Sequence, residues 1–361
     1  LAARCNYADN ATGVTNAYLE LLNNAQDRKT VAKAAKVLVK NDKSYVRCAG
    51  LRLLLKSDAA HAKKYILAAL KDGDIAYRNT ALDFAKQYAG GKIFDAVASK
   101  YSKYSERSKT DIIRWLGNNH VEGKMNLMTG AMKSSDSVLA CAAIEAAAKI
   151  GGKEALQALI DQLSGAYSKQ ANKALLTFKG NIKEGITNAL SNSDSSIVIQ
   201  ALKLASTRHM YSTYAKVKEL MHSNNAMISD AAYEALKGVS TPEKFGEICG
   251  LLNASQEDKV AKIQEGAKNA IASLSASKQY EAIKAQMDKS PKPSRYYPLL
   301  AQASNSQAIK LLLSEYEKDN TDLTAYKSLL SVNNPSIVPS LYRIASKESN
   351  KKDEILSRCI D

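Results

Sequence analysis

One pattern of apolar and polar residues returns along the chain about every 30 residues. In each copy, small or apolar residues recur at i, i+3, i+4 and i+7, which places them on one face of an α-helix. Copies of this helix begin at Tyr45, Ala76, Lys109, Val138, Ile197, Ile228 and Ile263. Between them lie shorter apolar stretches that predict a partner helix, for example 62–70, 154–163 and 245–252. Because no alternating pattern of any length appears, the sequence predicts almost no β-sheet.

Polar and glycine residues mark where these helices should begin and end. An Asp or Asn precedes several of the repeated helices and is expected to cap their first N–H groups. The expected caps are Asp74, Asp136, Asp194 and Asn225. Glycines are expected to stop the second helix of a pair, where the backbone turns left-handed. These glycines are Gly90, Gly117, Gly151, Gly180 and Gly238.

A pair of short helices cannot bury its apolar face alone, whereas stacked pairs bury each face against the next repeat. The sequence therefore predicts an all-α fold, a right-handed α-α superhelix (solenoid) of about eleven helix-pair repeats. One such solenoid is expected to span residues 1–361 as a single domain. Three prolines interrupt the pattern shortly after residue 290, so residues 288–298 are expected to form an irregular repeat or a hinge.

The second helices show the pattern apolar–Arg–x–x–Ala–apolar, with Arg47 and Arg78 at the arginine position and Lys109 at the same place in the third repeat. This pattern resembles the second helix of HEAT/armadillo-type repeats, including bacterial HEAT-like repeats. The resemblance covers nearly the whole chain and implies an interaction scaffold, although such scaffolds host unrelated roles. In that family the arginine commonly pairs with turn carboxylates between repeats. Here Asp42 and Asp74 precede Arg47 and Arg78 by five and four residues.

The motifs of common enzyme and metal sites are missing from the sequence. The 4 histidines belong to no H-E-x-x-H or H-x-x-x-H motif, and the 5 cysteines are never two to four residues apart. No phosphate-binding glycine loop and no G-x-S-x-G motif is present. We therefore predict that the protein is not an enzyme and uses no cofactor and no metal.

Positive charge is concentrated in the first third of the chain. The net charge is +15, and residues 1–120 contribute +10, from 21 Lys and Arg against 11 Asp and Glu. Helix 28–40 places lysines on one face and Val31, Ala35 and Leu38 on the other, which is also typical of a solvated amphipathic helix. Basic residues and two tyrosines between 47 and 109 extend this candidate binding surface, and Lys63, Lys64 and Arg107 lie in the same stretch. Its members are Lys29, Lys33, Lys36, Lys40, Arg47, Arg78, Lys100, Tyr101, Lys103, Tyr104 and Lys109.

Three hypotheses of function are open from the sequence. The first is a non-catalytic interaction scaffold that binds a protein or another extended partner on its concave helical face. The second is that the basic N-terminal surface binds nucleic acid or another polyanion, with a strong dependence on salt. The third is a supporting solenoid region of a larger extracytoplasmic bacterial carbohydrate-active protein, because the chain resembles HEAT regions attached to sugar-active domains.

The remaining expectations concern the state of the chain. We expect a monomer with a protein partner, an extracytoplasmic bacterial location in preference to a cytoplasmic one, and no membrane span, since no run of about 18 apolar residues occurs. The chain is expected to be a piece of a longer polypeptide with a further domain. Its last segment, 353–361, opens a helix that stops after about two turns, which would leave its apolar side chains poorly covered. These are Ile355, Leu356, Cys359 and Ile360.

Overall fold

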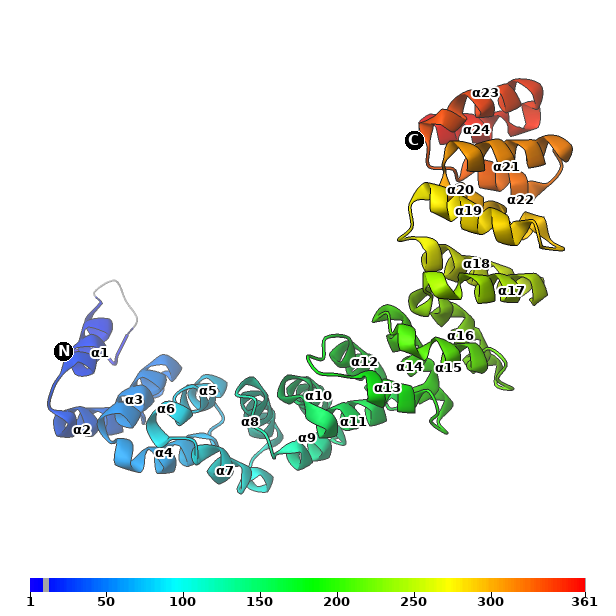
Figure 1. The fold of residues 1–361 in the computed structure, drawn as a ribbon. Helices are drawn as coiled ribbons and strands as arrows, with labels where there is room; N and C mark the ends of the chain where they lie inside the picture. The colour runs from blue at the N-terminus through cyan, green and yellow to red at the C-terminus, as the bar shows by residue number, and fades with distance from the viewer. Residues whose placement is uncertain (9–12, 361) are drawn as a thin grey trace. The chain divides into compact units, whose positions relative to one another are not determined.

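The computed structural model describes residues 1–8 and 13–360, and these consist of helices joined by turns (Figure 1). Helices account for 75% of the structure, and no strand occurs among the described residues. The predicted all-α fold is confirmed. The chain divides into two compact units, unit 1 (Leu1–Ile182) and unit 2 (Lys183–Asp361). A single domain over residues 1–361 stays a prediction.

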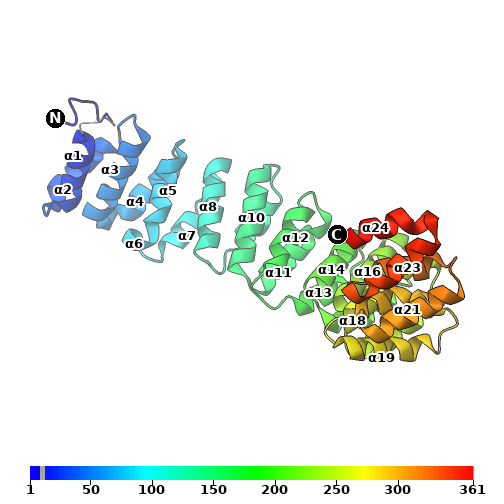
Figure 2. The same ribbon diagram turned by 90° about the horizontal axis from the view of Figure 1, so that it is seen from above.

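In unit 1, helix α1 (Val14–Asn24) precedes five helix pairs, which lie in a row in chain order (Figure 2). The first helices of these pairs are α2 (Arg28–Leu38), α4 (Ala62–Ala69), α7 (Ile93–Ala98), α9 (Met125–Met132) and α11 (Gly152–Asp161). The second helices are α3 (Ser44–Ser57), α5 (Ile75–Asp83) with its short continuation α6 (Ala85–Ala89), α8 (Glu106–Asn118), α10 (Ser137–Ile150) and α12 (Ser168–Leu176).

Unit 2 holds six further pairs, so the described residues form eleven pairs in all, which agrees with the predicted number of repeats. The first helices are α13 (Lys183–Ala189), α15 (Tyr214–Leu220), α17 (Phe245–Ala254), α19 (Ala276–Met287), α21 (Ser306–Lys318) and α23 (Val338–Lys347). The second helices are α14 (Ser195–Thr207), α16 (Ala226–Val239), α18 (Glu257–Ile271), α20 (Tyr297–Ala303), α22 (Leu323–Leu330) and α24 (Lys352–Ile360).

Second helices pack on one another within each unit and form what we call the second-helix layer. In unit 1, α3, α5, α8, α10 and α12 make successive contacts, and in unit 2 the same holds for α14, α16, α18, α20 and α22. Alanine side chains allow the helices to approach closely, because only a methyl group then separates the two backbones. Four alanines of the second helices are fully buried: Ala143, Ala201, Ala232 and Ala267.

Two of the glycines expected to stop helices are instead contact points between second helices. A Cβ atom at Gly117 would lie 2.6 Å from the Cβ of Ala146, and one at Gly238 would lie 2.1 Å from the carbonyl oxygen of Ser206. Both distances are too short for real atoms, so only glycine fits there. The expectation was wrong for these two because α8 and α16 continue past them.

The other turn signals behave as the sequence predicts, except for Gly180, for which the expected helix stop was wrong. Each of the four expected cap residues accepts a hydrogen bond from a backbone N–H of the helix that follows it. Gly90 and Gly151 follow the last residues of α6 and α10 with positive φ angles of 70° and 76°. Gly180 lies in the loop between α12 and α13 and ends neither helix.

The proline-rich stretch 288–298 folds into a short 3-10 helix, Pro293–Tyr296, that leads into α20. Its Arg295 is buried and donates hydrogen bonds to the carbonyl oxygens of Leu252 at 2.5 Å and Ser255 at 2.9 Å. These bonds attach the irregular segment to the end of α17. That the segment acts as a hinge stays a prediction.

The last helix, α24, is better covered than its sequence suggested. Ile355 is fully buried, and Leu356 and Cys359 are half-buried, so the expectation of poor coverage was wrong for Ile355. The side chain of Ile360 lies outside the described residues. Arg358 donates from Nε to the carbonyl oxygen of Leu330 at 2.8 Å, which ties α24 to the end of α22. Among the described helices, none combines the length and hydrophobicity needed to cross a bilayer.

Candidate binding surfaces

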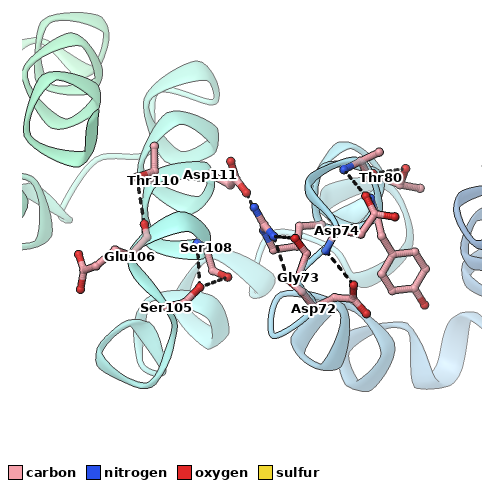
Figure 3. A network of polar contacts seen from close by, with 12 residues as sticks. Asp72, Gly73, Asp74, Thr80, Ser105, Glu106, Ser108, Thr110 and Asp111 are labelled. Atoms are coloured by element: carbon pink, nitrogen blue, oxygen red, sulfur yellow. Dashed lines mark hydrogen bonds and ion pairs between the residues drawn. The ribbon is translucent and has the colours of Figure 1, made fainter. Parts of the chain in front are cut away.

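Arg78, which was predicted to belong to an exposed surface, is the centre of a buried polar network in unit 1. It lies on α5 and is only 2% exposed. Its Nε donates to a carboxylate oxygen of Asp111 on α8 at 2.7 Å, and its Nη1 donates to the carbonyl oxygens of Asp72 and Gly73 at 2.8 and 3.0 Å (Figure 3). The network joins the turn before α5 to the next second helix. The surface prediction is wrong for Arg78, because these internal acceptors hold its guanidinium in the interior.

Arg47 makes the corresponding contact one repeat earlier, at the edge of the core. It pairs with the carboxylates of Asp72 and Asp74 in the following turn, and its guanidinium lies 4.3 Å from the ring centre of Tyr77. Burial would raise the pKa of Asp72, but the hydrogen bond from Arg47 and the nearby positive charges lower it on balance. Arg47 thus pairs with turn carboxylates between repeats, as the resemblance implies, but with residues that follow it instead of Asp42. Arg78 pairs with Asp111 on helix α8 instead of with Asp74, so the expected partner was wrong for both arginines.

The segment between α7 and α8 holds the two tyrosines of the predicted surface. Tyr104 is buried, and its hydroxyl, like that of Tyr101, has no hydrogen-bond partner among the described residues. Burial is the main cause that raises the pKa of Tyr101 to about 12. Lys109 pairs with Glu106 at 2.7 Å and lies 5.9 Å from the Tyr101 ring centre. The surface prediction is wrong for Tyr104, because its ring packs in the apolar interior of unit 1.

The lysines of α2 and its following turn are exposed, as the sequence pattern predicts. Val31, Ala35 and Leu38, on the opposite face, are buried in a cluster with residues of α1 and α3. The exposed residues are Lys29, Lys33, Lys36 and Lys40. Lys36 lies 3.9 Å from Asp58, a distance at which an exposed ion pair contributes little. Binding of a partner by this face stays a prediction.

A shallow pocket along α4 gathers further lysines, and we call it the lysine pocket. Its volume is about 520 Å³, and it reaches from α4 to the end of α7. The lysines that line it are Lys63, Lys64, Lys71 and Lys100. No carboxylate of the described residues comes within ion-pairing distance of their ammonium groups. Lys103, the remaining residue of the predicted surface, is exposed in the turn after α7.

Each unit also has a groove in its second-helix layer that the sequence analysis missed. The α10/α12 groove of unit 1 has a volume of about 670 Å³ and is lined from the end of α8 to the turn after α12. The residues of its lining that bear on binding are His120, Glu145, Lys149, Lys169, Lys173 and Lys179. The average charge of residues 121–240 is low, so no regional excess of charge pointed to this groove.

The α14/α16 groove of unit 2 has a volume of about 820 Å³ and a different chemistry. Met227 on its rim is 64% exposed. Its two carboxylates are paired: Lys259 lies 3.2 Å from a carboxylate oxygen of Asp230, and Lys262, beside the lining, lies 3.1 Å from one of Glu234. Lys203 and Lys237, which also line the groove, have no carboxylate partner among the described residues. The hydrogen bonds from the two lysines lower the pKa of Asp230. This groove therefore offers apolar surface beside two carboxylates that are already paired with lysines.

Paired helices stacked in sequence define the protein as an α-solenoid, a class that binds partners along its helical layers. No group of three or more metal-ligating side chains occurs among the described residues. The chain matches no model of a known protein family, and no curated protein matches it.

Solved structures with similar helical arrangements have low sequence identity to the chain. An engineered protein is 15% identical with a TM-score of 0.34, and the match covers 93% of this chain and 98% of that one. Importin beta is 10% identical with a TM-score of 0.36, over 97% of this chain and 62% of that one. A microtubule polymerase structure with TOG domain arrays is 11% identical with a TM-score of 0.34, over 98% of each chain. At these values, the similarity carries no argument about function.

Proposed function

We propose that the chain is a non-catalytic scaffold that binds an extended protein segment along its second-helix layer. The observation that carries the proposal is that each unit has a groove of several hundred cubic ångströms between successive second helices. Clefts of about 300–1,000 Å³ are typical of binding sites. The grooves lie in the layer formed by stacking, so neighbouring repeats can each contribute contacts to one partner.

The spacing of the repeats suits an extended partner. Packed helices lie about 8–10 Å apart, and an extended chain advances about 3.3 Å per residue. A bound segment therefore needs about three residues to pass from one second helix to the next. In the α14/α16 groove, Met227 supplies flexible apolar contact area, while the neighbouring ion pair of Asp230 and Lys259 sets a polar edge.

The test is a selection of peptides from a random library displayed on phage, with the full chain as the target. The selected peptides should bind the wild-type chain and lose about tenfold in affinity for Met227→Glu, because a carboxylate replaces the apolar rim of the groove. Tyr342→Glu is the matched control, since Tyr342 is a 51% exposed side chain on the first helix α23. Equal binding by both variants, or a selection that yields no binder, would refute the proposal.

A second candidate function is polyanion binding by the lysine pocket, and the observation that favours it is the cluster of four lysines without carboxylate partners. Binding of a single-stranded oligonucleotide should then weaken steeply as salt rises, because released counterions drive such binding. Lys64→Gln/Lys100→Gln should reduce both the affinity and the salt dependence. A flat salt response would rule this function out.

A further inference from the structure

The α10/α12 groove carries an excess of positive charge. Four lysines and one glutamate line it, which leaves three net positive charges around a volume of about 670 Å³. The lysines are Lys149, Lys169, Lys173 and Lys179, and the glutamate is Glu145. Lys149, Lys169 and Lys173 belong to two successive second helices, so stacking of the repeats brings their charges together.

None of these four lysines has a carboxylate partner among the described residues. In the part of the chain that the structure describes, no Asp or Glu lies within ion-pairing distance of Lys169, Lys173 or Lys179. The α14/α16 groove has the corresponding position between second helices, yet there Lys259 is paired with Asp230. The lining of the unit 2 groove sets two carboxylates against three lysines, a net charge of +1, whereas the lining of the unit 1 groove sets one carboxylate against four lysines, a net charge of +3. The groove of unit 1 therefore leaves more positive charge available to a ligand.

Helix stability explains only some of these positions. Lys149 and Lys173 lie in the last turns of α10 and α12, where the helix dipole favours a positive charge. Lys169 lies in the first turn of α12, where the same dipole disfavours one. The helix dipole therefore does not account for a lysine at position 169. A contact with a ligand would account for it.

The side of the groove next to α8 is held by hydrogen bonds. His120 has a left-handed backbone with φ of 51°, and its Nδ1 lies 2.6 Å from the carbonyl oxygen of Lys149. A carbonyl oxygen can only accept, so Nδ1 of His120 carries the proton. The Nζ of Lys149 donates to the side-chain oxygen of Asn118 at 2.7 Å. Because Asn118 is neutral, Lys149 is positioned without losing its charge.

We propose that the α10/α12 groove binds an acidic peptide segment, whose carboxylates contact Lys149, Lys169 and Lys173. This inference rests on the scaffold function proposed above and names the chemistry of the partner in unit 1. The lining contains no aromatic side chain apart from the imidazole of His120, whereas single-stranded nucleic acid is held by stacking on aromatic rings. Glu145 would repel a continuous phosphate backbone, but it can accept a hydrogen bond from a peptide N–H.

The test is the binding of a fluorescein-labelled peptide of alternating glutamate and glycine to the full chain, measured by fluorescence anisotropy. Lys169→Gln/Lys173→Gln should weaken the binding about tenfold, because two charge-assisted contacts are lost. Lys86→Gln/Lys92→Gln makes the same change in net charge at two exposed lysines of unit 1 that lie outside the grooves and the lysine pocket, and it should keep the affinity within about twofold of wild type. The substituted lysines of both variants are exposed, and equal melting temperatures of the two variants and wild type would show that each variant remains folded.

Removing negative charge from the groove, instead of positive charge, tests the same arrangement of side chains. Glu145→Gln should tighten peptide binding about threefold, because it removes from the groove lining the one negative charge, which repels the carboxylates of the peptide. Glu20→Gln, an exposed residue on α1, makes the same change in net charge and should have no effect.

Three results would overturn the inference. The first is an absence of peptide binding, and the second is an equal loss in both lysine variants, which would indicate unspecific charge attraction. The third is tighter binding of an oligothymidine of equal charge that depends on Lys169 and Lys173, which would assign the groove to nucleic acid. The peptide selection described above tests Met227 in the groove of unit 2. If that selection succeeds while one of these three results is found, the scaffold proposal holds and only the inference about unit 1 fails.

Discussion

Replacing Arg78 by methionine is expected to destabilise unit 1 more than any exposed substitution in it. Methionine keeps much of the aliphatic volume but removes the guanidinium. The change leaves the carboxylate of Asp111, which is 6% exposed, without its 2.7 Å partner. It also removes the donor that two backbone carbonyls share, those of Asp72 and Gly73. Removing one partner of a buried ion pair costs about 3–5 kcal/mol, and we expect a loss of that size.

The chain contains a natural probe for this measurement. Trp115, the single tryptophan, lies on α8 one turn after Asp111, and its ring packs 4.6 Å from that of Phe94. Tryptophan fluorescence during urea unfolding therefore reports on the helix that loses the contact. The free energy of unfolding is obtained from the midpoint and slope of this transition.

Two further variants separate the buried pair from a general effect of charge. Arg47→Met removes a half-exposed arginine from the corresponding place one repeat earlier and should cost about 1 kcal/mol or less. Arg78→Met/Asp111→Leu removes both charges and should recover part of the loss, because no unpaired carboxylate is left. The reasoning is refuted if Arg78→Met lies within about 0.5 kcal/mol of wild type, or if the second substitution destabilises the single variant further.

Three other predictions follow from burial and charge. Ala201→Leu should overpack the fully buried site of Ala201 on α14 and cost about 1–3 kcal/mol in a denaturant melt, and no loss would show that this site is not tightly packed. The pKa of Asp72 is lowered in the folded chain. Its ion pair with Arg47 therefore stabilises the fold fully above pH about 4, and this stabilisation is lost as the pH falls through the pKa of Asp72 in the folded chain. The difference in melting temperature between wild type and Arg47→Met should therefore be present at pH about 7 and shrink as the pH is lowered below about 4, and a constant difference would contradict this. Burial raises the pKa of the Cys249 thiol to about 12, so a thiol reagent should modify exposed Cys5 and spare Cys249 until the chain unfolds; equal rates would contradict the placement.

The helical repeat could be predicted from the sequence because its signals are local. Periodic apolar residues fix which helix face is buried, and an aspartate such as Asp74 caps the helix that follows it in the chain. Whether a given repeat arginine is exposed or buried could not be predicted in this way. Arg47 and Arg78 occupy the same place in the repeat, yet one is half-exposed and the other buried, because Arg78 has a carboxylate at Asp111, 33 residues away. Contacts over that separation are set by stacking, which local patterns do not specify.

The grooves were missed for a related reason. Lys149 and Lys169 are far apart in sequence and meet only because α10 and α12 stack. Regional net charge hid them, since acidic residues of the same third pair elsewhere, as Asp230 does with Lys259 and Lys262. The misassigned Gly117 shows the same limit, because a glycine that stops a helix and one that touches a neighbouring helix look alike in sequence.

The central claim, that partners bind on the second-helix layer, is tested most directly by photo-cross-linking. A peptide selected on the full chain is made with a photoreactive benzophenone side chain, irradiated in complex, and its attachment sites are mapped by mass spectrometry. The account predicts cross-links to second helices, with Met227 on α16 among the modified residues. Cross-links confined to first helices, such as α15 or α17, would contradict it.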